Sequence, residues 1–300
     1  MHSNLLYGID LGGTKIEGVV LDKSGQVKIR QRIPTEREKG YVHILNQIAA
    51  MVEQLEDAVG EKASYIGIGT PGTAEPSTGL MKNCNTTVLN GKPLRSDLSK
   101  KIGREIRLSN DANCFALAET KLGVVQQELP NAKVVFGVIM GTGVGGGLVL
   151  DGKAWTGSQG IAGEWGHAFL DHSGGHCYCG RVGCIETIIS GTALERYYAR
   201  LSGKDKKLKD IVSDFRANSD QYAEVTIRRL LHFFGKGIAN IINTLDPDAV
   251  VLGGGLGQID ELYTLGIIEI EKHLFNPKLN TPILKPLLGD SAGVFGAAML

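Results

Sequence analysis

The sequence has no net charge and no long apolar run. Its 32 acidic residues balance its 32 basic residues, so the overall positive charge that attracts nucleic acid or anionic membranes is missing. No apolar stretch reaches the roughly 20 residues that a membrane-spanning helix needs. We therefore expect neither nucleic acid nor a membrane as a partner. The lysines in 204–209 are a local group, which we expect to lie in a solvated loop.

Cysteine is also scarce, with five residues in 300. Three of them lie in one short cluster, which favours a reducing compartment over a disulfide framework. Residues 1–10 contain no basic segment followed by a long apolar core, which is the pattern of a secretory signal. We therefore expect a soluble protein of the cytoplasm.

The cysteine cluster follows a histidine in the series H-x9-C-x-C-x4-C, within a glycine-rich segment. The series consists of His167, Cys177, Cys179 and Cys184. One imidazole nitrogen and three thiolates are the ligands that a tetrahedral structural zinc prefers, and glycines let a short loop wrap round the ion. The alternative is that the cysteines are ordinary small apolar residues, although the flanking Gly, Arg and Tyr make a poor core. His176 competes as a ligand but adjoins Cys177, and His172 is a weaker rival.

Two carboxylates flank this cluster, because Glu164 precedes His167 by three residues and Glu186 follows Cys184 by two. Carboxylates accept hydrogen bonds from neighbouring hydroxyls, and a metal-fixed loop would hold them rigidly. The pattern predicts a site for a polyhydroxylated ligand. The alternative is a pair of exposed, solubilising charges.

Glycine-rich turns occur at three places. Asp10 and a Gly-Gly-Thr turn stand between two strand-like runs, and residues 141–147 follow an apolar run that ends at Met140. This repeat predicts two β-hairpins whose bare backbone approaches the phosphates of a nucleotide. A third turn, 253–255, suits an adenosine. The alternative is a set of ordinary glycine turns.

Asp111 stands where an apolar run, 106–108, meets a helical segment. Open α/β sheets place their chemistry at such strand ends, so we expect Asp111 to be catalytic. The alternative is a helix N-cap, which Asn and Asp both favour. We expect a small α/β domain over 1–118, completed by a C-terminal helix over 289–300. A large α/β domain over 119–288 would carry the zinc loop, 163–186.

The motifs together resemble the ROK sugar kinases over the whole chain. They are DLGGTK at Asp10, TPG at Thr70, NDAN at Asn110, MGTGVGGG at Met140, EWGH at Glu164, CYCGRVGCIE at Cys177 and VVLGGG at Val250. The resemblance implies a two-domain actin/hexokinase-like (ribonuclease H-like) α/β fold with a central nucleotide and sugar cleft. It also implies a structural Zn²⁺, Mg²⁺ with ATP, and a homodimer.

The resemblance also implies roles for individual residues. Asp111 would be the general base, and Asp10 would help to place Mg²⁺. The sugar would be held by Asn110, Glu164, His167, Glu186, Gly72 and Asn85. The nucleotide would contact Asp10, Gly12, Gly13, Thr14, Lys15, Gly141, Thr142, Gly143, Gly254 and Gly255. His167 would thus bind zinc through one ring nitrogen and sugar through the other.

The implied reaction is phosphoryl transfer from ATP to the 6-hydroxyl of a hexose. The segments KNCNTTVLNGKPL (82–94) and IETIISGT (185–192) resemble the fructokinases of this family most, so we expect fructose, and also mannose. The alternatives are an N-acetylglucosamine kinase or a glucokinase. Some relatives are sugar-sensing regulators with a DNA-binding module ahead of the kinase-like body. The first predicted strand starts near Leu5 and leaves no room for one, so we expect an enzyme.

Overall fold

The computed structural model describes residues 5–300, so the first four residues of the segment searched for a secretory signal lie outside it. The chain forms two compact units. Unit 1 comprises Met1–Asn131, Gly147–Gly163 and Leu287–Leu300, and unit 2 comprises Ala132–Gly146 and Glu164–Pro286.

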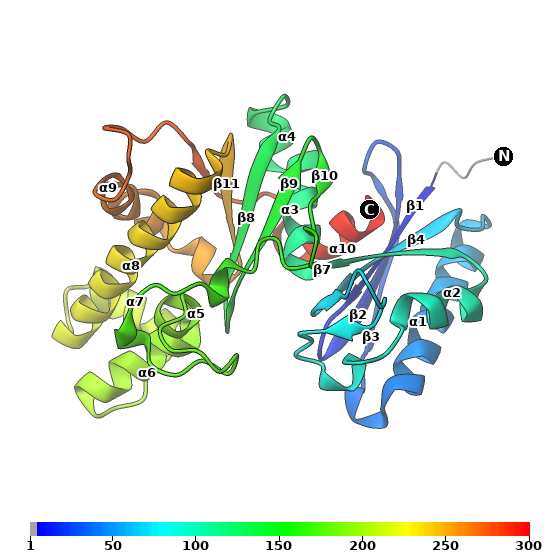
Figure 1. The fold of residues 1–300 in the computed structure, drawn as a ribbon, viewed down its shortest axis with the longest axis horizontal. Coiled ribbons are helices and arrows are strands. Elements are labelled where there is room, and N and C mark those ends of the chain that lie inside the picture. The colour runs from blue at the N-terminus through cyan, green and yellow to red at the C-terminus, as the bar shows by residue number, and fades with distance from the viewer. Residues whose placement is uncertain (1–4) are drawn as a thin grey trace. The chain divides into compact units, whose positions relative to one another are not determined.

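Unit 1 is built on a five-stranded sheet of order β3-β2-β1-β4-β7 (Figure 1). Its strands are β1 (Leu5–Leu11), β2 (Lys15–Asp22), β3 (Val27–Pro34), β4 (Tyr65–Thr70) and β7 (Glu105–Asn110). The first three strands are antiparallel neighbours, whereas β4 runs parallel to both β1 and β7. The carboxyl ends of β1, β4 and β7 therefore reach the same edge of the sheet.

One face of this sheet is covered by α1 (Tyr41–Val59) and α2 (Leu94–Ile102). Helix α1 buries a stripe at helical spacing, with Ile44, Ile48, Met51, Val52 and Leu55 among its members. This stripe packs against alternate residues of the strands, which the sequence periodicity predicts. The main core of unit 1 lies on this face.

The other face is covered by α3 (Asp111–Lys121) and α10 (Ala292–Ala298). Glycines bring these elements close together. A Cβ atom on Gly67 of β4 would stand 1.7 Å from the carbonyl oxygen of Ala297, and one on Gly296 would stand 1.7 Å from that of Cys114. The C-terminal helix is therefore an integral part of unit 1.

Shorter elements complete unit 1. They are β5 (Thr73–Ala74), β6 (Met81–Lys82) and α4 (Val124–Glu128), with β10 (Lys153–Ala154) in the returning segment. Strands β5 and β6 pair as a small antiparallel hairpin. Helix α3 continues through residue 118, and the compact unit ends at Asn131. The predicted division at 118 stays a prediction, and it differs from the unit boundary because α3 packs within unit 1.

Unit 2 contains β8 (Val134–Met140), β11 (Ala249–Gly253) and β12 (Ile283–Leu284), which are parallel neighbours. Strand β9 (Val144–Leu150) begins in unit 2 and ends in unit 1, and the whole sheet has the order β10-β9-β8-β11-β12. The helices are α5 (Glu186–Ile189), α6 (Gly191–Ser202), α7 (Leu208–Arg216), α8 (Gln221–Leu245) and α9 (Leu265–Glu271). The long α8 buries most of its apolar residues and contacts each of the other four helices.

None of the helices that residues 5–300 form combines the length and the apolar character that a membrane crossing needs. The mixed α/β architecture and the division into two units agree with the predicted fold class.

Candidate active site

Three strand ends of unit 1 bring several predicted site residues together. Across the sheet, Asp10 pairs with Gly69 and Thr70 pairs with Asn110. The Thr70 hydroxyl donates to the carbonyl oxygens of Gly72, at 2.8 Å, and Ser109, at 3.1 Å. The sheet register therefore places Asp10, the turn at Gly72 and the start of α3 at one edge.

The start of α3 separates the two roles that the sequence left open for its Asn-Asp pair. The side chain of Asn110 caps the helix, because its Oδ1 accepts from the backbone N–H of Asn113 at 2.8 Å. Asp111 is the first helical residue and is exposed to solvent. Its Oδ1 accepts from the N–H of Ala112 at 2.8 Å. Since Asn110 supplies the cap, Asp111 presents a carboxylate at the surface, as a general base requires.

Asp10, at the end of β1, has an unusual titration. Burial raises its pKa to about 7, and the negative charges of Asp111 and Glu17 add to this effect, while Lys15 and Arg32 oppose it. Asp10 pairs with Gly69, and Gly69 pairs with Ser109, two residues before Asp111, so two carboxylates share this edge of the sheet. A divalent cation would relieve their repulsion, so the pair fits the predicted Mg²⁺ position.

The turn between β1 and β2 holds the other predicted phosphate residues of unit 1. The N–H of Gly12 donates to the carbonyl of Lys15 at 3.0 Å, and the Thr35 hydroxyl donates to the carbonyl of Gly12 at 2.7 Å. Thr14 and Lys15, which follow Gly12 and Gly13 in this turn, are exposed. The hairpin prediction is confirmed here. The buried carboxylate of Glu17 supports the turn from β2 through ion pairs with arginines of β3.

Gly72 and Asn85, two of the predicted sugar contacts, belong to neighbouring turns. The N–H of Asn85 donates to the carbonyl of Pro71 at 3.4 Å. A Cβ on Gly72 would stand 2.6 Å from the Cys84 sulfur and from the Lys82 carbonyl oxygen, so only glycine fits this approach. Asn85 itself is exposed and available to a ligand.

In unit 2 the four predicted zinc ligands converge. The ligand atoms of His167, Cys177, Cys179 and Cys184 all lie within 4.8 Å of one another. His167 Nδ1 is 3.5 Å from Cys177 Sγ, and Cys179 Sγ is 3.6 Å from Cys184 Sγ. A tetrahedron with Zn–S bonds of about 2.3 Å has edges of roughly 3.8 Å. The donor set and its spacing therefore fit a Zn²⁺ ion.

The other ring nitrogen of His167 has a neighbour that the sequence analysis missed. Its Nε2 lies 3.0 Å from the hydroxyl of Tyr178, and the two rings meet edge to face. A sugar hydroxyl would have to share or displace this contact, so the predicted double role of His167 depends on Tyr178. The sequence contains a signal for this contact, because Tyr178 stands between two of the cysteines.

The two acids that flank the zinc ligands are both partly buried. Burial raises the pKa of Glu164, and the charge of Glu186 adds to this, whereas His167 opposes it. Glu186 begins α5, and its Oε2 accepts from the N–H of Val144 at 3.0 Å. A Cβ on Gly143 would stand 2.4 Å from that oxygen. Glu186 therefore links the zinc loop to the glycine-rich turn after β8.

The glycine-rich turns of unit 2 border a cavity of about 570 Å³. Gly141, Thr142 and Gly255 line it, together with residues of α6 and α7. The carbonyl of Gly141 accepts from the N–H of Gly191 at 2.8 Å, and that of Thr142 accepts from the Thr192 hydroxyl at 2.7 Å. Gly254 has a φ of 76°, and a Cβ there would meet the Met140 carbonyl at 2.3 Å. A cavity of this size, walled in part by glycine backbone, has room for an adenosine, and its role as the adenosine site stays a prediction.

One expectation is wrong in part. Lys206 is not simply solvated, because its Nζ lies 2.5 Å from an oxygen of Asp214 and 2.7 Å from one of Asp220. Lys207 and Lys209 line the cavity just described. The lysine segment leads into α7, which carries it against other elements of unit 2, and nothing in the local sequence signals this.

The predicted residues thus form two groups, one in each unit. Comparison with known proteins then identifies the chain, because the model of the ROK family matches residues 6–300. The chain belongs to the ROK family.

Relatives of this ROK protein match it over nearly its whole length. A protein of Histophilus somni named N-acetyl-D-glucosamine kinase is 37% identical over 307 residues, which cover 99% of this chain and 98% of the relative. The crystal structure of a ROK hexokinase from Thermus thermophilus has a TM-score of 0.87 at 33% identity, covering 98% of this chain and 97% of that one. A ROK glucokinase from Streptomyces griseus, solved with glucose and AMPPNP, has a TM-score of 0.79 at 27% identity, with 98% of each chain covered. The family resemblance and the fold class are confirmed.

Proposed function

We propose that this protein transfers the γ-phosphoryl group of ATP to the 6-hydroxyl of N-acetyl-D-glucosamine. Sugar phosphorylation, the coarser activity, follows from membership of the ROK family and from relatives of equal length that are named as sugar kinases. The choice of sugar rests on one observation. Relatives 37% identical across 99% of the chain, from Histophilus somni and Aliivibrio fischeri, are named N-acetyl-D-glucosamine kinases.

This proposal replaces fructose as the expected substrate. The fructose expectation depended on two segments, 82–94 and 185–192, whereas the similarity to N-acetyl-D-glucosamine kinases extends over the whole chain. Identity over a whole chain samples every loop that shapes the pocket, so it carries more weight than two short segments. Fructose, mannose and glucose remain the comparison substrates.

We assign the proton transfer to Asp111. Its exposed carboxylate, at the start of α3, would accept the proton of the sugar 6-hydroxyl as the oxygen attacks the γ-phosphorus. The bond from the γ-phosphorus to the bridging oxygen breaks, and ADP leaves. Such a reaction needs little covalent work from the protein, so position and charge neutralisation govern the rate. Asn110, Gly72 and Asn85 would fix the sugar from unit 1.

In unit 2 the acids near the zinc ligands would hold further sugar hydroxyls. Glu186 is oriented by the N–H of Val144, and Glu164 directly precedes the 3₁₀ turn, Trp165–His167, that carries His167. The zinc ion, held by His167, Cys177, Cys179 and Cys184, would stiffen this loop and take no part in the chemistry. Rigid carboxylates lose little freedom on binding, which favours affinity for a polyhydroxylated ligand.

The nucleotide would use both glycine-rich turns. Gly12, Gly13, Thr14 and Lys15 of unit 1 and Gly141, Thr142 and Gly143 of unit 2 are the proposed phosphate contacts, and the 570 Å³ cavity is the proposed adenosine site. Mg²⁺, placed with the help of Asp10, would neutralise phosphate charge. ATP as donor and reduced thiols as zinc ligands would both suit the cytoplasm, and the cytoplasmic location stays a prediction. The homodimer that the family resemblance implies stays a prediction.

An ADP-release assay with MgATP tests this proposal. The panel contains N-acetylglucosamine, N-acetylmannosamine, glucose, mannose and fructose, and kcat/KM is measured for each. We expect N-acetylglucosamine to exceed the others by at least about tenfold, since a polar group that the pocket binds specifically is worth that much. A fructose preference would restore the earlier expectation. No turnover with any sugar would remove the kinase proposal.

The base is tested with Asp111→Asn, which keeps the size of the side chain. We expect turnover to fall by about 10²- to 10⁴-fold, the usual contribution of a general base, while sugar binding is retained. Asp57→Asn, on the exposed face of α1, makes the same chemical change and should leave turnover unaltered. Near-normal turnover in Asp111→Asn would contradict the assignment.

A further inference from the structure

Three arginines line a small cavity in unit 2 that the proposed reaction does not use. The cavity has a volume of about 200 Å³, and its charged lining residues are Arg196 and Arg200 of α6 and Arg229 of α8. Its other lining residues are Ser173, Gly174, Thr187, Ile188, Ala193 and Tyr197. No aspartate or glutamate from the described part of the chain lines this cavity.

The partners of these arginines leave their charge largely uncompensated. Arg229 donates from Nη2 to the Ser173 hydroxyl at 2.8 Å, and its guanidinium carbon lies 4.6 Å from the centre of the Tyr197 ring. Arg200 lies 5.2 Å from the same ring. Among residues 5–300, Arg196 has no hydrogen bond or ion pair, and neither Arg200 nor Arg229 has an ion pair.

The arrangement is unfavourable for the isolated protein. Arg196 and Arg200 are four residues apart on one helix, and like charges at that spacing repel. Burial lowers the pKa of Arg229, and the charge of Arg200 lowers it further, although Tyr197 and Asp171 act in the opposite direction. Asp171 is itself engaged as the cap of a 3₁₀ helix, where it accepts from the N–H of Ser173. An anion bound among the three guanidinium groups would remove this repulsion.

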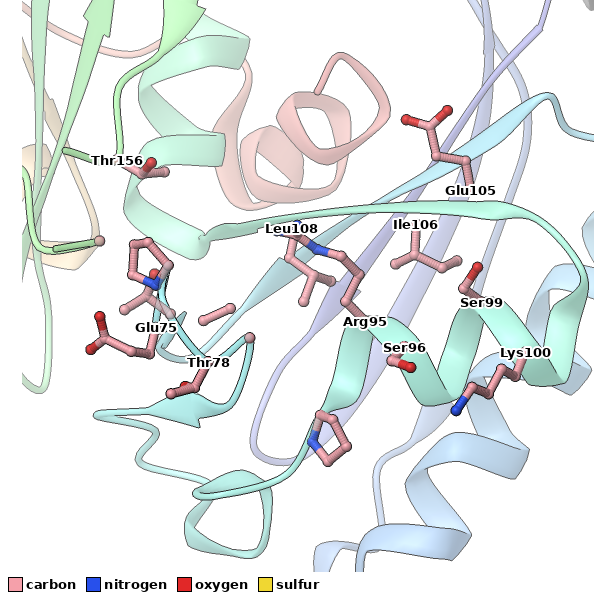
Figure 2. A pocket seen from close by; sticks show the side chains of 16 residues that line it. Glu75, Thr78, Arg95, Ser96, Ser99, Lys100, Glu105, Ile106, Leu108 and Thr156 are labelled. Atoms are coloured by element: carbon pink, nitrogen blue, oxygen red, sulfur yellow. The ribbon is translucent and has the colours of Figure 1, made fainter. Parts of the chain in front are cut away.

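A larger cavity in unit 1 is lined by charges of both signs, unlike the three-arginine cavity. It has a volume of about 750 Å³ and lies between α2 and the β5–β6 hairpin, beside β7 (Figure 2). Arg95 and Lys100 line it, but so do Glu75 and Glu105, so its charges are of both signs. Of these two cavities, the smaller one combines several cations without an acid, which makes it the more selective for anions.

We propose that the three-arginine cavity binds the phosphate group of a small anion, either inorganic phosphate or a phosphorylated sugar. The planar guanidinium group donates two parallel hydrogen bonds, and phosphate oxygens accept them in matching geometry. The volume equals that of about seven water molecules at roughly 30 Å³ each, enough for a phosphate and part of an attached group. This inference is independent of the proposed kinase activity, since it needs no turnover.

The cavity shares its walls with two parts of the proposed active site. Helix α6 carries Thr192 and Glu195 on the side of the 570 Å³ cavity, and Arg196 and Arg200 on the side of the arginines. Ser173 belongs to the zinc loop, between His167 and Cys177. A phosphate that orders α6 and Ser173 would therefore affect the proposed nucleotide-binding and sugar-binding residues of unit 2.

The test is calorimetric titration of the zinc-loaded protein. Inorganic phosphate and N-acetylglucosamine 6-phosphate are titrated separately, each with saturating ADP and N-acetylglucosamine present to fill the proposed nucleotide and sugar sites. We expect a single phosphate site in both titrations. Equal affinities would identify the phosphate group alone as the ligand, and tighter binding of the sugar phosphate would identify the phosphorylated sugar. Both outcomes support the proposal, and absence of phosphate binding would overturn it.

Variants locate the site. Arg196→Gln and Arg200→Gln should each weaken phosphate binding by at least about tenfold, since each removes charged hydrogen bonds. Neither side chain is buried, so both variants should fold, and their circular dichroism checks this. Arg228→Gln is the matched control, because Arg228 is next to Arg229 but pairs with Glu224. Binding that survives both α6 variants, or that falls equally in Arg228→Gln, would overturn the proposal.

Discussion

Asp10→Asn is expected to stabilise the protein and to impair its proposed activity. The Asp10 carboxyl lies at the end of β1, near Asp111, and its pKa is raised to about 7, mainly by burial. The folded state therefore holds the proton more tightly than the unfolded chain does. Asparagine resembles the protonated form and does not ionise, so the variant avoids the unfavourable charge. The amide is also a poorer partner for Mg²⁺.

The sign and size follow from linkage. A carboxyl whose folded pKa lies above its unfolded value of 3.8 lowers stability as pH rises between those values, and the full loss is reached above about pH 7. A shift of about 3 units corresponds to roughly 4 kcal/mol at 1.36 kcal/mol per unit. Asp10 keeps partial contact with solvent, which reduces the effect, so we expect a gain of about 2 kcal/mol at pH 8.

Thermal unfolding at pH 5 and pH 8, in buffer without Mg²⁺ and nucleotide, measures this effect. A chain of 300 residues has an unfolding entropy of about 0.6 kcal/mol/K at Tm, so about 2 kcal/mol corresponds to a rise in Tm of roughly 3 °C. The gain should be clearly smaller at pH 5, where the wild-type carboxyl is largely protonated in the folded state. Asp57→Asn, on the exposed face of α1, should leave Tm unchanged at both pH values.

Two results would refute this reasoning. A lower Tm for Asp10→Asn at pH 8 would mean that the ionised carboxylate stabilises the fold. An equal gain at pH 5 and pH 8 would mean that the effect is not due to ionisation.

Three further changes test other parts of the structure. Cys179→Ser should abolish stoichiometric zinc binding, because one of the four converging ligands is weakened. Residues 163–186 should then become sensitive to proteolysis before the protein unfolds globally. A variant that keeps zinc and resists proteolysis would argue against a structural ion. Gly67→Ala should lower the free energy of unfolding by about 1–3 kcal/mol, because the new Cβ would stand 1.7 Å from the Ala297 carbonyl oxygen and displace α10. An unchanged Tm would show that α10 packs less closely. Gly143→Ala should reduce kcat/KM with little change in Tm, because the new Cβ would push the Glu186 carboxylate away from the turn. Unaltered kinetics would remove Glu186 from the proposed site.

Much of the candidate site follows from short segments. The predicted zinc ligands span a single loop, so their spacing alone predicts convergence, and the structure brings their ligand atoms within 4.8 Å of one another. The first hairpin and the start of α3 are equally local, since turn residues and a capping residue act on their immediate neighbours. The family motifs are short strings too, which is why the family was recognisable from the sequence.

Other features depend on residues that are distant in the chain. The sequence left open which member of the Asn-Asp pair caps α3, and only the hydrogen bond from Asn113 decides for Asn110. The contact between Glu186 and the turn at Gly143 joins segments 43 residues apart, and no spacing rule connects them. Lys206 was expected in solvent, yet it pairs with two aspartates once α7 is folded.

The sequence by itself determined the family, the cluster of predicted zinc ligands and the acid at the start of α3, because each depends on short motifs. The tertiary structure decided how Asp10 titrates, what the second nitrogen of His167 contacts and where three arginines share a cavity. Those properties arise when sheet register and helix packing bring distant segments together. Burial, charge proximity and close approach are then set by neighbours that the linear sequence does not specify.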